Sequence, residues 1–151
     1  MNTVKSFGIN DEEIIIIAEM KINIDQLSEV KDFCEFYSNI VMENEPDVYE
    51  WKFFLNEEIQ SVTLFERYRD SKALMNHGVN ISTGGILEEH FQEFMRIFTF
   101  KSIKVLGECS EELKKSHEQI DLNFLDRLVW IVLIVIVLLL FSTGVRCFRL
   151  D

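Results

Sequence analysis

The chain of 151 residues lacks the motifs of several common catalytic and binding sites. It has no phosphate-binding glycine loop, no nucleophile motif and no cluster of metal-ligand residues. Its three cysteines, Cys34, Cys109 and Cys147, lie far apart in the sequence, and none forms a CxxC pair. This spacing favours reduced thiols over a disulfide framework or a metal site. Cys34 lies within a helical pattern, which favours a small apolar filler over a catalytic nucleophile.

Basic residues are scarce. The chain has 15 Lys and Arg against 26 Asp and Glu, which gives a formal net charge of −11. Residues 121–151 contain three arginines and three aspartates, so the whole net charge belongs to residues 1–120. This acidity predicts no nucleic-acid partner, because phosphate binding needs Lys and Arg on one face. The same acidity argues against residues 1–120 lying flat on a surface of anionic lipid.

Charge is absent from residues 128–145, a run of 18 residues dominated by Leu, Ile and Val. At about 1.5 Å per residue, a helix of this length covers about 27 Å, close to the hydrocarbon thickness of a bilayer. Trp130 near one end, and Arg146 and Arg149 beyond the other, suit interfacial anchoring. The run therefore predicts a transmembrane helix. The alternative is a buried core helix, which the remaining residues are too few to enclose.

The N-terminal region has no signal-peptide pattern. Residues 1–13 are polar and acidic, and the apolar run 14–17 is too short for the hydrophobic region of a signal peptide. We therefore expect a membrane protein with a single C-terminal anchor and its globular part in the cytoplasm. The positive-inside tendency weakly opposes this orientation, because Arg146 and Arg149 would lie outside.

Hydrophobic spacing predicts elements in the order strand, helix, strand, strand, helix, strand. In the strand at 48–55, strict alternation places Tyr49 and Trp51 on one face. Asp25 is the expected N-cap of the first helix, and Asp70 or Ser71 that of a short extra helix. The expected strands are 14–22, 48–55, 59–68 and 100–106, the helices 27–42, 72–77 and 87–98, and the glycine-rich loop 78–85.

This order is the split βαβ, ferredoxin-like arrangement of an α+β fold. A single antiparallel sheet with helices on one face leaves its other face uncovered. The strands at 14–22 and 48–55 carry apolar residues on both faces, so we expect a second copy of the chain to cover the open face in a homodimer. The expected organisation is a domain at 1–115, a linker at 116–127 and the span at 128–145.

Aromatic residues and one histidine recur along the second and third strands and the helix that follows. Trp51 and Phe53 can stack against a flat ring and exclude water. Tyr68 can donate a hydrogen bond to a developing oxyanion. His77 can accept a proton, because the unperturbed pKa of histidine is about 6.5. These residues predict a pocket for an oxidisable aromatic ring.

Phe91 and Phe94 of the helix at 87–98 would form the opposite wall of that pocket. Each proposed role has a structural alternative. The four aromatic side chains can be ordinary core, Tyr68 can be a cross-strand packing residue, and His77 can be a capping or surface residue. Glu66 can pair with a basic group or act as an acid, while His90 and His117, which lie among glutamates, are expected to be solvated.

Several strings resemble the antibiotic biosynthesis monooxygenase domain family, and most of all its quinol monooxygenase branch. They are EPDVYEW at 45–51, FERYRDS at 65–71, ALMNH at 73–77 and VLGE at 105–108. The resemblance covers about residues 12–115, together with the order of elements. The apolar tail departs from the family, whose members usually end soon after the last strand.

The resemblance implies a dimeric α+β barrel with a pocket between the sheet and the helices of each subunit. It also implies oxidation of a phenol, quinol or polyketide ring by dioxygen without flavin or metal. We therefore expect a cofactor-independent monooxygenase with His77 and Tyr68 as catalytic residues and a small aromatic substrate. The alternatives are a non-catalytic, membrane-tethered dimeric module that binds a hydrophobic small molecule, and haem handling, which some relatives perform.

Overall fold

One twisted sheet organises the part of the chain that the computed structural model describes, residues 11–116 and 122–125. The strand order is β2-β3-β1-β4-β5. The first four strands pair antiparallel, and β5 pairs parallel with β4. The strands are β1 Ile14–Ile22, β2 Val48–Asn56, β3 Ser61–Tyr68, β4 Phe98–Leu106 and β5 Leu122–Leu125.

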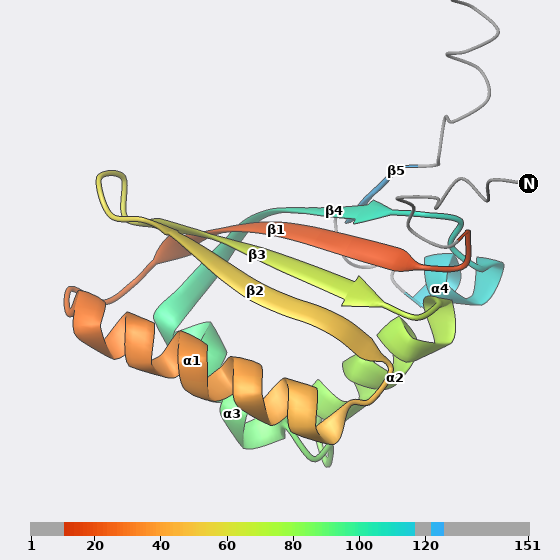
Figure 1. Ribbon diagram of the computed structural model, residues 1–151, viewed down its shortest axis with the longest axis horizontal. Coiled ribbons are helices and arrows are strands. Elements are labelled where there is room, and N and C mark those ends of the chain that lie inside the picture. The colour runs from red at the N-terminus through yellow and green to blue at the C-terminus, as the bar shows by residue number, and fades with distance from the viewer. Residues whose placement is uncertain (1–10, 117–121, 126–151) are drawn as a thin grey trace, which may run out of the picture.

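Three helices cover one face of this sheet, and the opposite face is open in the described part of the chain (Figure 1). A short fourth helix, α4, lies beside α2. The four-stranded part of the sheet with helices on one face is the predicted ferredoxin-like α+β arrangement. The helices are α1 Leu27–Asn44, α2 Ser71–Ile81, α3 Glu88–Ile97 and α4 Glu111–Ser116.

The C-terminal predictions meet the structure only in part. The polar, charged segment after β4 forms the short helix α4, and β5 lies inside residues 116–127, which were expected to be a linker. Part of that segment therefore belongs to the sheet. The predicted span at 128–145 lies outside the described residues. Within residues 11–116 and 122–125, no helix has both the length and the apolar composition needed to cross a bilayer.

The start of α2 follows the predicted capping rule. The Asp70 carboxylate accepts a hydrogen bond from the backbone N–H of Ala73 at 2.8 Å, which lowers the pKa of Asp70. The helix then continues through Gly78 to Ile81, so the prediction of a loop from residue 78 was wrong for its first four positions. One glycine costs a helix only about 1 kcal/mol relative to alanine, which packing against the core can offset.

Two other local predictions were wrong. α1 begins after Gln26 rather than Asp25, and no side chain caps it. Tyr49 does not share a face with Trp51, because the register of β2 shifts between Val48 and Glu50 and leaves Tyr49 as an extra residue. A bulge of this kind turns the following residues to the other face of the strand. Val48 and Trp51 are buried as a result, while Tyr49 is 41% exposed.

The core lies between the sheet and the three helices and is rich in aromatic rings. Phe94 of α3 stands 5.0 Å from Phe98 and 5.4 Å from Tyr37, measured between ring centroids. Phe33 of α1 stacks on Tyr37 at 5.4 Å. Offset and tilted ring pairs at these separations add to the stabilisation that burial of apolar area provides. These rings fix α1 and α3 relative to the sheet and so define the space left beside them.

Candidate active site

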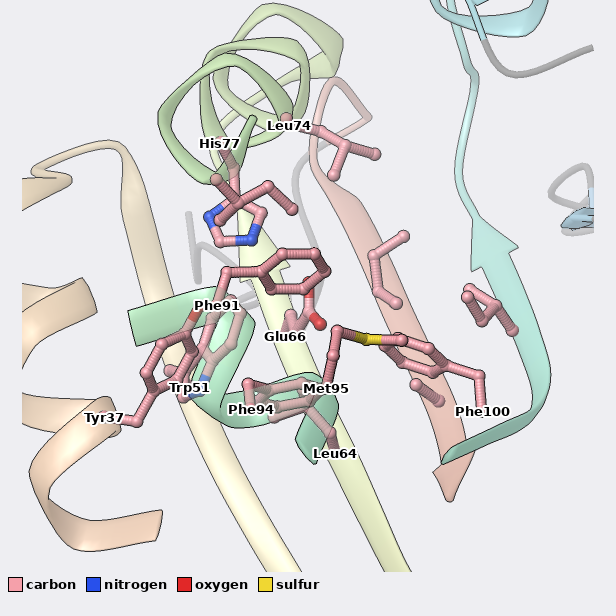
Figure 2. Close-up of a pocket in the computed structure, with 15 residues that line it drawn as sticks. Tyr37, Trp51, Leu64, Glu66, Leu74, His77, Phe91, Phe94, Met95 and Phe100 are labelled. Atoms are coloured by element: carbon pink, nitrogen blue, oxygen red, sulfur yellow. The ribbon is translucent and has the colours of Figure 1, made fainter. Parts of the chain in front are cut away.

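A pocket of about 270 Å³ lies between the sheet and the three covering helices (Figure 2). Strands β1, β3 and β4 supply its largely apolar floor, which includes Ala18, Leu64 and Ile103. The polar groups on the wall come from α1, β2, β3 and α2. Small-molecule sites in proteins have this character, with an apolar lining and few, well-placed polar groups. The pocket is therefore the candidate functional site.

Four of the six predicted site residues line this pocket. They are Trp51 of β2, His77 of α2, and Phe91 and Phe94 of α3. The rings of Trp51 and His77 lie 5.0 Å apart, and those of Phe91 and Phe94 stack at 5.8 Å. Residues from three separate elements thus meet around one space, and their role in catalysis or binding stays a prediction.

Tyr68 and Phe53 are the two predicted site residues that the structure does not place on the wall. Tyr68 is fully buried, and its hydroxyl donates a hydrogen bond to Oε2 of Glu66 at 2.5 Å. Phe53 packs behind Trp51 and stacks on Phe98 at 6.1 Å. Tyr68 therefore acts on the pocket through Glu66, and Phe53 is a packing residue that supports Trp51.

The imidazole of His77 is held by a carboxylate. Nδ1 of His77 lies 3.0 Å from both carboxylate oxygens of Glu45, and both side chains are buried. Asn80 donates a further hydrogen bond to Oε1 of Glu45 at 3.2 Å. An ionised carboxylate only accepts hydrogen bonds, so Nδ1 carries the hydrogen and Nε2 is the free nitrogen of the neutral ring. The pair has the geometry of a base and the group that orients it.

Glu45 reaches this position because of the way α1 ends. It is the C-cap residue of α1, and its backbone N–H donates to the carbonyl of Val41 at 2.9 Å. Pro46 follows, and the residue before a proline is driven out of the helical conformation. Sequence reasoning treated this position as part of a connection and missed its role. The string EPDVYEW contains Glu45, but nothing in the spacing links it to a histidine 32 positions later.

Glu66 is a second carboxyl group on the pocket wall. Burial raises its pKa, and the negative charge of Glu45 adds to this effect. The hydrogen bond from Tyr68, and the charge of His77 whenever its imidazole is protonated, act in the opposite direction but do not cancel the rise. Glu66 therefore keeps its proton to a higher pH than an ordinary glutamate does. The sequence also allowed Glu66 to pair with a basic group, and the basic group that acts on it in the structure is His77.

Two buried donors on the wall have no partner within the described part of the chain. They are the hydroxyl of Tyr37 and Nε1 of Trp51. Tyr37 is 1% exposed and Trp51 is 6% exposed. Burial raises the pKa of Tyr37, and the charges of Glu66 and Glu45 raise it further, so its hydroxyl stays protonated. The sequence showed Tyr37 only as a residue of the apolar face of a helix.

Within the described part of the chain, no cysteine and no histidine other than His77 lines this pocket. Within residues 11–116 and 122–125, no three His, Cys, Asp or Glu side chains are grouped as a metal site would require. Burial raises the pKa of Cys34 to about 12, so it remains a thiol that packs against the core. His90 is only half-buried and packs edge-on against Phe36 at 5.4 Å. His117 and Cys147 lie outside the described residues.

Comparison with known structures identifies the fold. MupZ from Pseudomonas fluorescens matches with a TM-score of 0.62 and 22% identity, over 77% of this chain and 90% of that chain. SnoaB, a cofactor-independent oxygenase from Streptomyces nogalater, matches with a TM-score of 0.51 and 9% identity, over 66% of this chain and 95% of that chain. No protein-family model matches the sequence, and no curated protein is significantly similar to it.

Identities this low relate folds and do not transfer an activity. The matches span 77% and 66% of this chain, and the sequence resemblance covered about residues 12–115. They confirm the α+β fold that the resemblance implied for the single chain, the fold of the antibiotic biosynthesis monooxygenases, and the dimer that it also implied stays a prediction.

Proposed function

We propose that this protein is a cofactor-independent monooxygenase that oxidises a small phenol or quinol-like aromatic with dioxygen. The observation that carries the proposal is the buried His77, which lines an apolar pocket while Glu45 holds its Nδ1. The fold shared with SnoaB, which is named as a cofactor-independent oxygenase, supports the same class of reaction.

The first step of the proposed reaction is a proton transfer. Nε2 of His77 takes the proton of the ring hydroxyl, and the Glu45 carboxylate stabilises the imidazolium through its bond to Nδ1. Trp51, Phe91 and Phe94 stack around the ring and exclude water, which strengthens these interactions. The product of this step is a phenolate, which gives up an electron far more readily than the phenol does.

Dioxygen then supplies the oxygen atom. The phenolate passes one electron to dioxygen, and the resulting aryloxyl radical and superoxide combine to form a carbon–oxygen bond. The peroxide takes the proton from His77. Loss of the proton on that ring carbon to His77 then breaks the oxygen–oxygen bond and leaves a carbonyl and hydroxide, which the imidazolium protonates. One phenol and one dioxygen give one quinone and one water, and the base is regenerated.

The experiment uses the full chain in mild detergent with 1,5-dihydroxynaphthalene as the probe. We expect oxygen uptake above the uncatalysed rate, one dioxygen consumed per quinone formed, and one labelled oxygen atom in the quinone when labelled dioxygen is supplied. His77→Ala is expected to lower the rate by about 10²–10⁴-fold, the usual contribution of a general base. His90→Ala is the matched control and leaves the rate unchanged, because His90 lies outside the pocket.

A second candidate function is a non-catalytic module that binds a hydrophobic small molecule. The mainly apolar lining of the pocket favours it as a binding site whether or not a reaction follows. The same experiment separates the two functions. Saturable binding of the probe, with oxygen uptake no faster than the uncatalysed rate in both the wild type and His77→Ala, would support the binding module and contradict the monooxygenase.

We further propose that the protein forms a homodimer that is anchored to a membrane. The open face of the sheet supports the dimer, since Phe54 is 56% exposed there and Tyr49 41%. An apolar surface of this kind is a common site for a second copy of a chain. The uncharged run at 128–145 supports the anchor, which would hold the pocket near aromatic compounds dissolved in lipid.

A further inference from the structure

One methionine has a distinctive place on the wall of the pocket. Met95 of α3 is 43% exposed, whereas the other lining residues are buried or half-buried in the part of the chain that the structure describes. Among those described lining residues, it is also the only one that contains sulfur. Its side chain borders water on one side and the pocket on the other, which places a thioether at the mouth.

The surroundings of Met95 suit a side chain that moves when a ligand enters. Figure 2 shows it extending from α3 toward Phe100 of β4. A thioether packs well beside aromatic rings, and its rotatable bonds let it take up different positions there. Gly78 of α2 lines the same pocket, and a carbon atom added to it would meet nothing within 4 Å. The wall therefore combines a flexible side chain on α3 with an open position on α2.

A thioether reduces hydroperoxides in a single two-electron step. The lone pair of the sulfur attacks the terminal oxygen, so a sulfur–oxygen bond forms as the oxygen–oxygen bond breaks. The proton of the hydroperoxide moves to the oxygen that leaves, and the products are an alcohol and methionine sulfoxide. The step is balanced, because the sulfur loses the two electrons that the peroxide gains. A hydroperoxide that is apolar enough to enter the pocket thus meets this sulfur directly.

We propose that Met95 is a modification site, at which an apolar hydroperoxide bound in the pocket transfers one oxygen atom to the thioether. The apolar wall holds such a compound beside Met95, and a water-soluble peroxide gains no such advantage. The proposed monooxygenase reaction passes through a ring peroxide in the same pocket, so turnover would supply this oxidant. A hydroperoxide from outside serves equally well, and the modification therefore does not depend on oxygenase activity.

Oxidation of Met95 changes the mouth of the pocket. The sulfoxide is polar where the thioether was apolar, and its oxygen accepts hydrogen bonds from water. An apolar ligand that enters past this group must displace that water, which costs affinity. The modification therefore weakens the binding of apolar ligands and limits further use of the pocket.

Limited oxidation of the full chain in mild detergent, followed by peptide mass spectrometry, tests the modification. Met42 of α1 is the internal reference, because it is 42% exposed and does not line the pocket. Hydrogen peroxide should oxidise Met95 and Met42 at rates within about threefold of each other, since the two are almost equally exposed. Cumene hydroperoxide should oxidise Met95 about tenfold faster than Met42 or more, with one cumyl alcohol formed per sulfoxide.

Gly78→Leu connects this selectivity to the pocket. The added side chain occupies part of the space beside the wall, so the preference of cumene hydroperoxide for Met95 should fall to about threefold or less. The rates with hydrogen peroxide should stay unchanged. If Gly78→Leu does not fold, saturating naphthalene in the wild type takes its place, and it should slow the oxidation of Met95 but not that of Met42.

Calorimetric titration with naphthalene measures the effect on binding. Treatment with cumene hydroperoxide should weaken the affinity of the wild type about three- to tenfold, the worth of one polar group at the mouth. Met95→Leu, which conserves the volume of the side chain, should keep its affinity after the same treatment. Met42→Leu is the matched control and should lose as much affinity as the wild type does.

The outcomes separate this inference from the monooxygenase proposal, because the hydroperoxide is added directly. Equal oxidation of Met95 and Met42 by cumene hydroperoxide overturns the inference even if the protein consumes oxygen. A preference for Met95 that Gly78→Leu or naphthalene leaves intact overturns it as well. A strong preference for Met95 in a protein that consumes no oxygen with 1,5-dihydroxynaphthalene supports the inference and contradicts the monooxygenase.

Discussion

Glu50 and Glu66 lie on neighbouring strands of one sheet, one register step apart, yet their environments are opposite. In the pairing of β2 with β3, Glu50 stands opposite Arg67, and Glu66 stands opposite Trp51. Glu50 lies on the open face, where a hydrogen bond from Lys52 and the charge of Arg67 lower its pKa. Glu66 lies under the helices, where burial raises its pKa.

This difference shows that the two faces of the sheet hold their ionisable groups in different environments. On the open face, charged groups lie beside opposite charges and near water. Holding these charges there costs little free energy, and their ion pairs contribute little to stability. On the covered face, a carboxyl group and an imidazole stand in an apolar pocket, where ionisable groups are costly and are expected at functional sites. The same strands therefore carry paired, exposed charges on one face and the candidate site on the other.

The largest expected effect that tests this comparison comes from a matched pair of phenylalanines. Phe94→Ala, on the covered face, removes a ring that is 2% exposed and contacts Tyr37 and Phe98. We expect a loss of about 3–5 kcal/mol in the free energy of unfolding. Phe54→Ala, on the open face, removes a ring that is 56% exposed in the single chain and should cost about 0.5 kcal/mol or less in the dilute, monomeric protein.

Urea denaturation of the full chain at several protein concentrations measures both effects. A loss for Phe54→Ala that shrinks as the protein is diluted, because both proteins then become monomeric, would show that a second copy covers the open face, and would sharpen the comparison. Similar losses for the two variants at every concentration would break it.

The sequence predicted most of the fold because local patterns determine it. The apolar run of β1, the alternation in β2 and the helical spacing in α1 and α3 identify these elements, and the order of elements leaves few topologies. The prediction failed in β2, where one extra residue changed which side chains face the helices. The extra residue Tyr49 turned Val48 and Trp51 to the same side of β2, and no property of the sequence marks that bulge.

The candidate site was less predictable than the fold. Trp51 and His77 stood out because their side chains are chemically distinctive and their elements are well defined. Glu45 and Tyr37 did not, because their roles depend on contacts with residues that are distant in the sequence. Tyr68 carried a suitable hydroxyl, but Glu66 accepts its hydrogen bond, and only the packing reveals this.

A smaller effect is expected from Glu66→Gln on the covered face. The pKa of Glu66 is raised in the folded protein, so its contribution to stability is fully present below the unfolded pKa and is lost as the pH rises through the folded pKa. Glutamine has the same shape and does not titrate. It should therefore match the wild type near pH 4 and exceed it by about 1 kcal/mol near pH 8.

Urea denaturation across that pH range measures the difference. His77, Tyr68 and Glu45, which face Glu66, are present in both proteins, so the comparison isolates the replacement of the Glu66 carboxyl group. If the Glu66→Gln variant became less stable than the wild type as the pH rose, Glu66 would be ionised and well paired in the folded state.

The smallest expected effect is that of Glu50→Gln on the open face. The pKa of Glu50 is lowered in the folded protein, so its contribution is present above the unfolded pKa and is lost as the pH falls through the folded pKa. The variant should lose at most about 0.5 kcal/mol near neutral pH, nothing in strong acid, and less in high salt. Because this trend with pH is opposite to that of Glu66→Gln, the two variants in one denaturation series compare the faces directly. Trends of the same sign would mean that the face of the sheet does not decide how its carboxyl groups titrate.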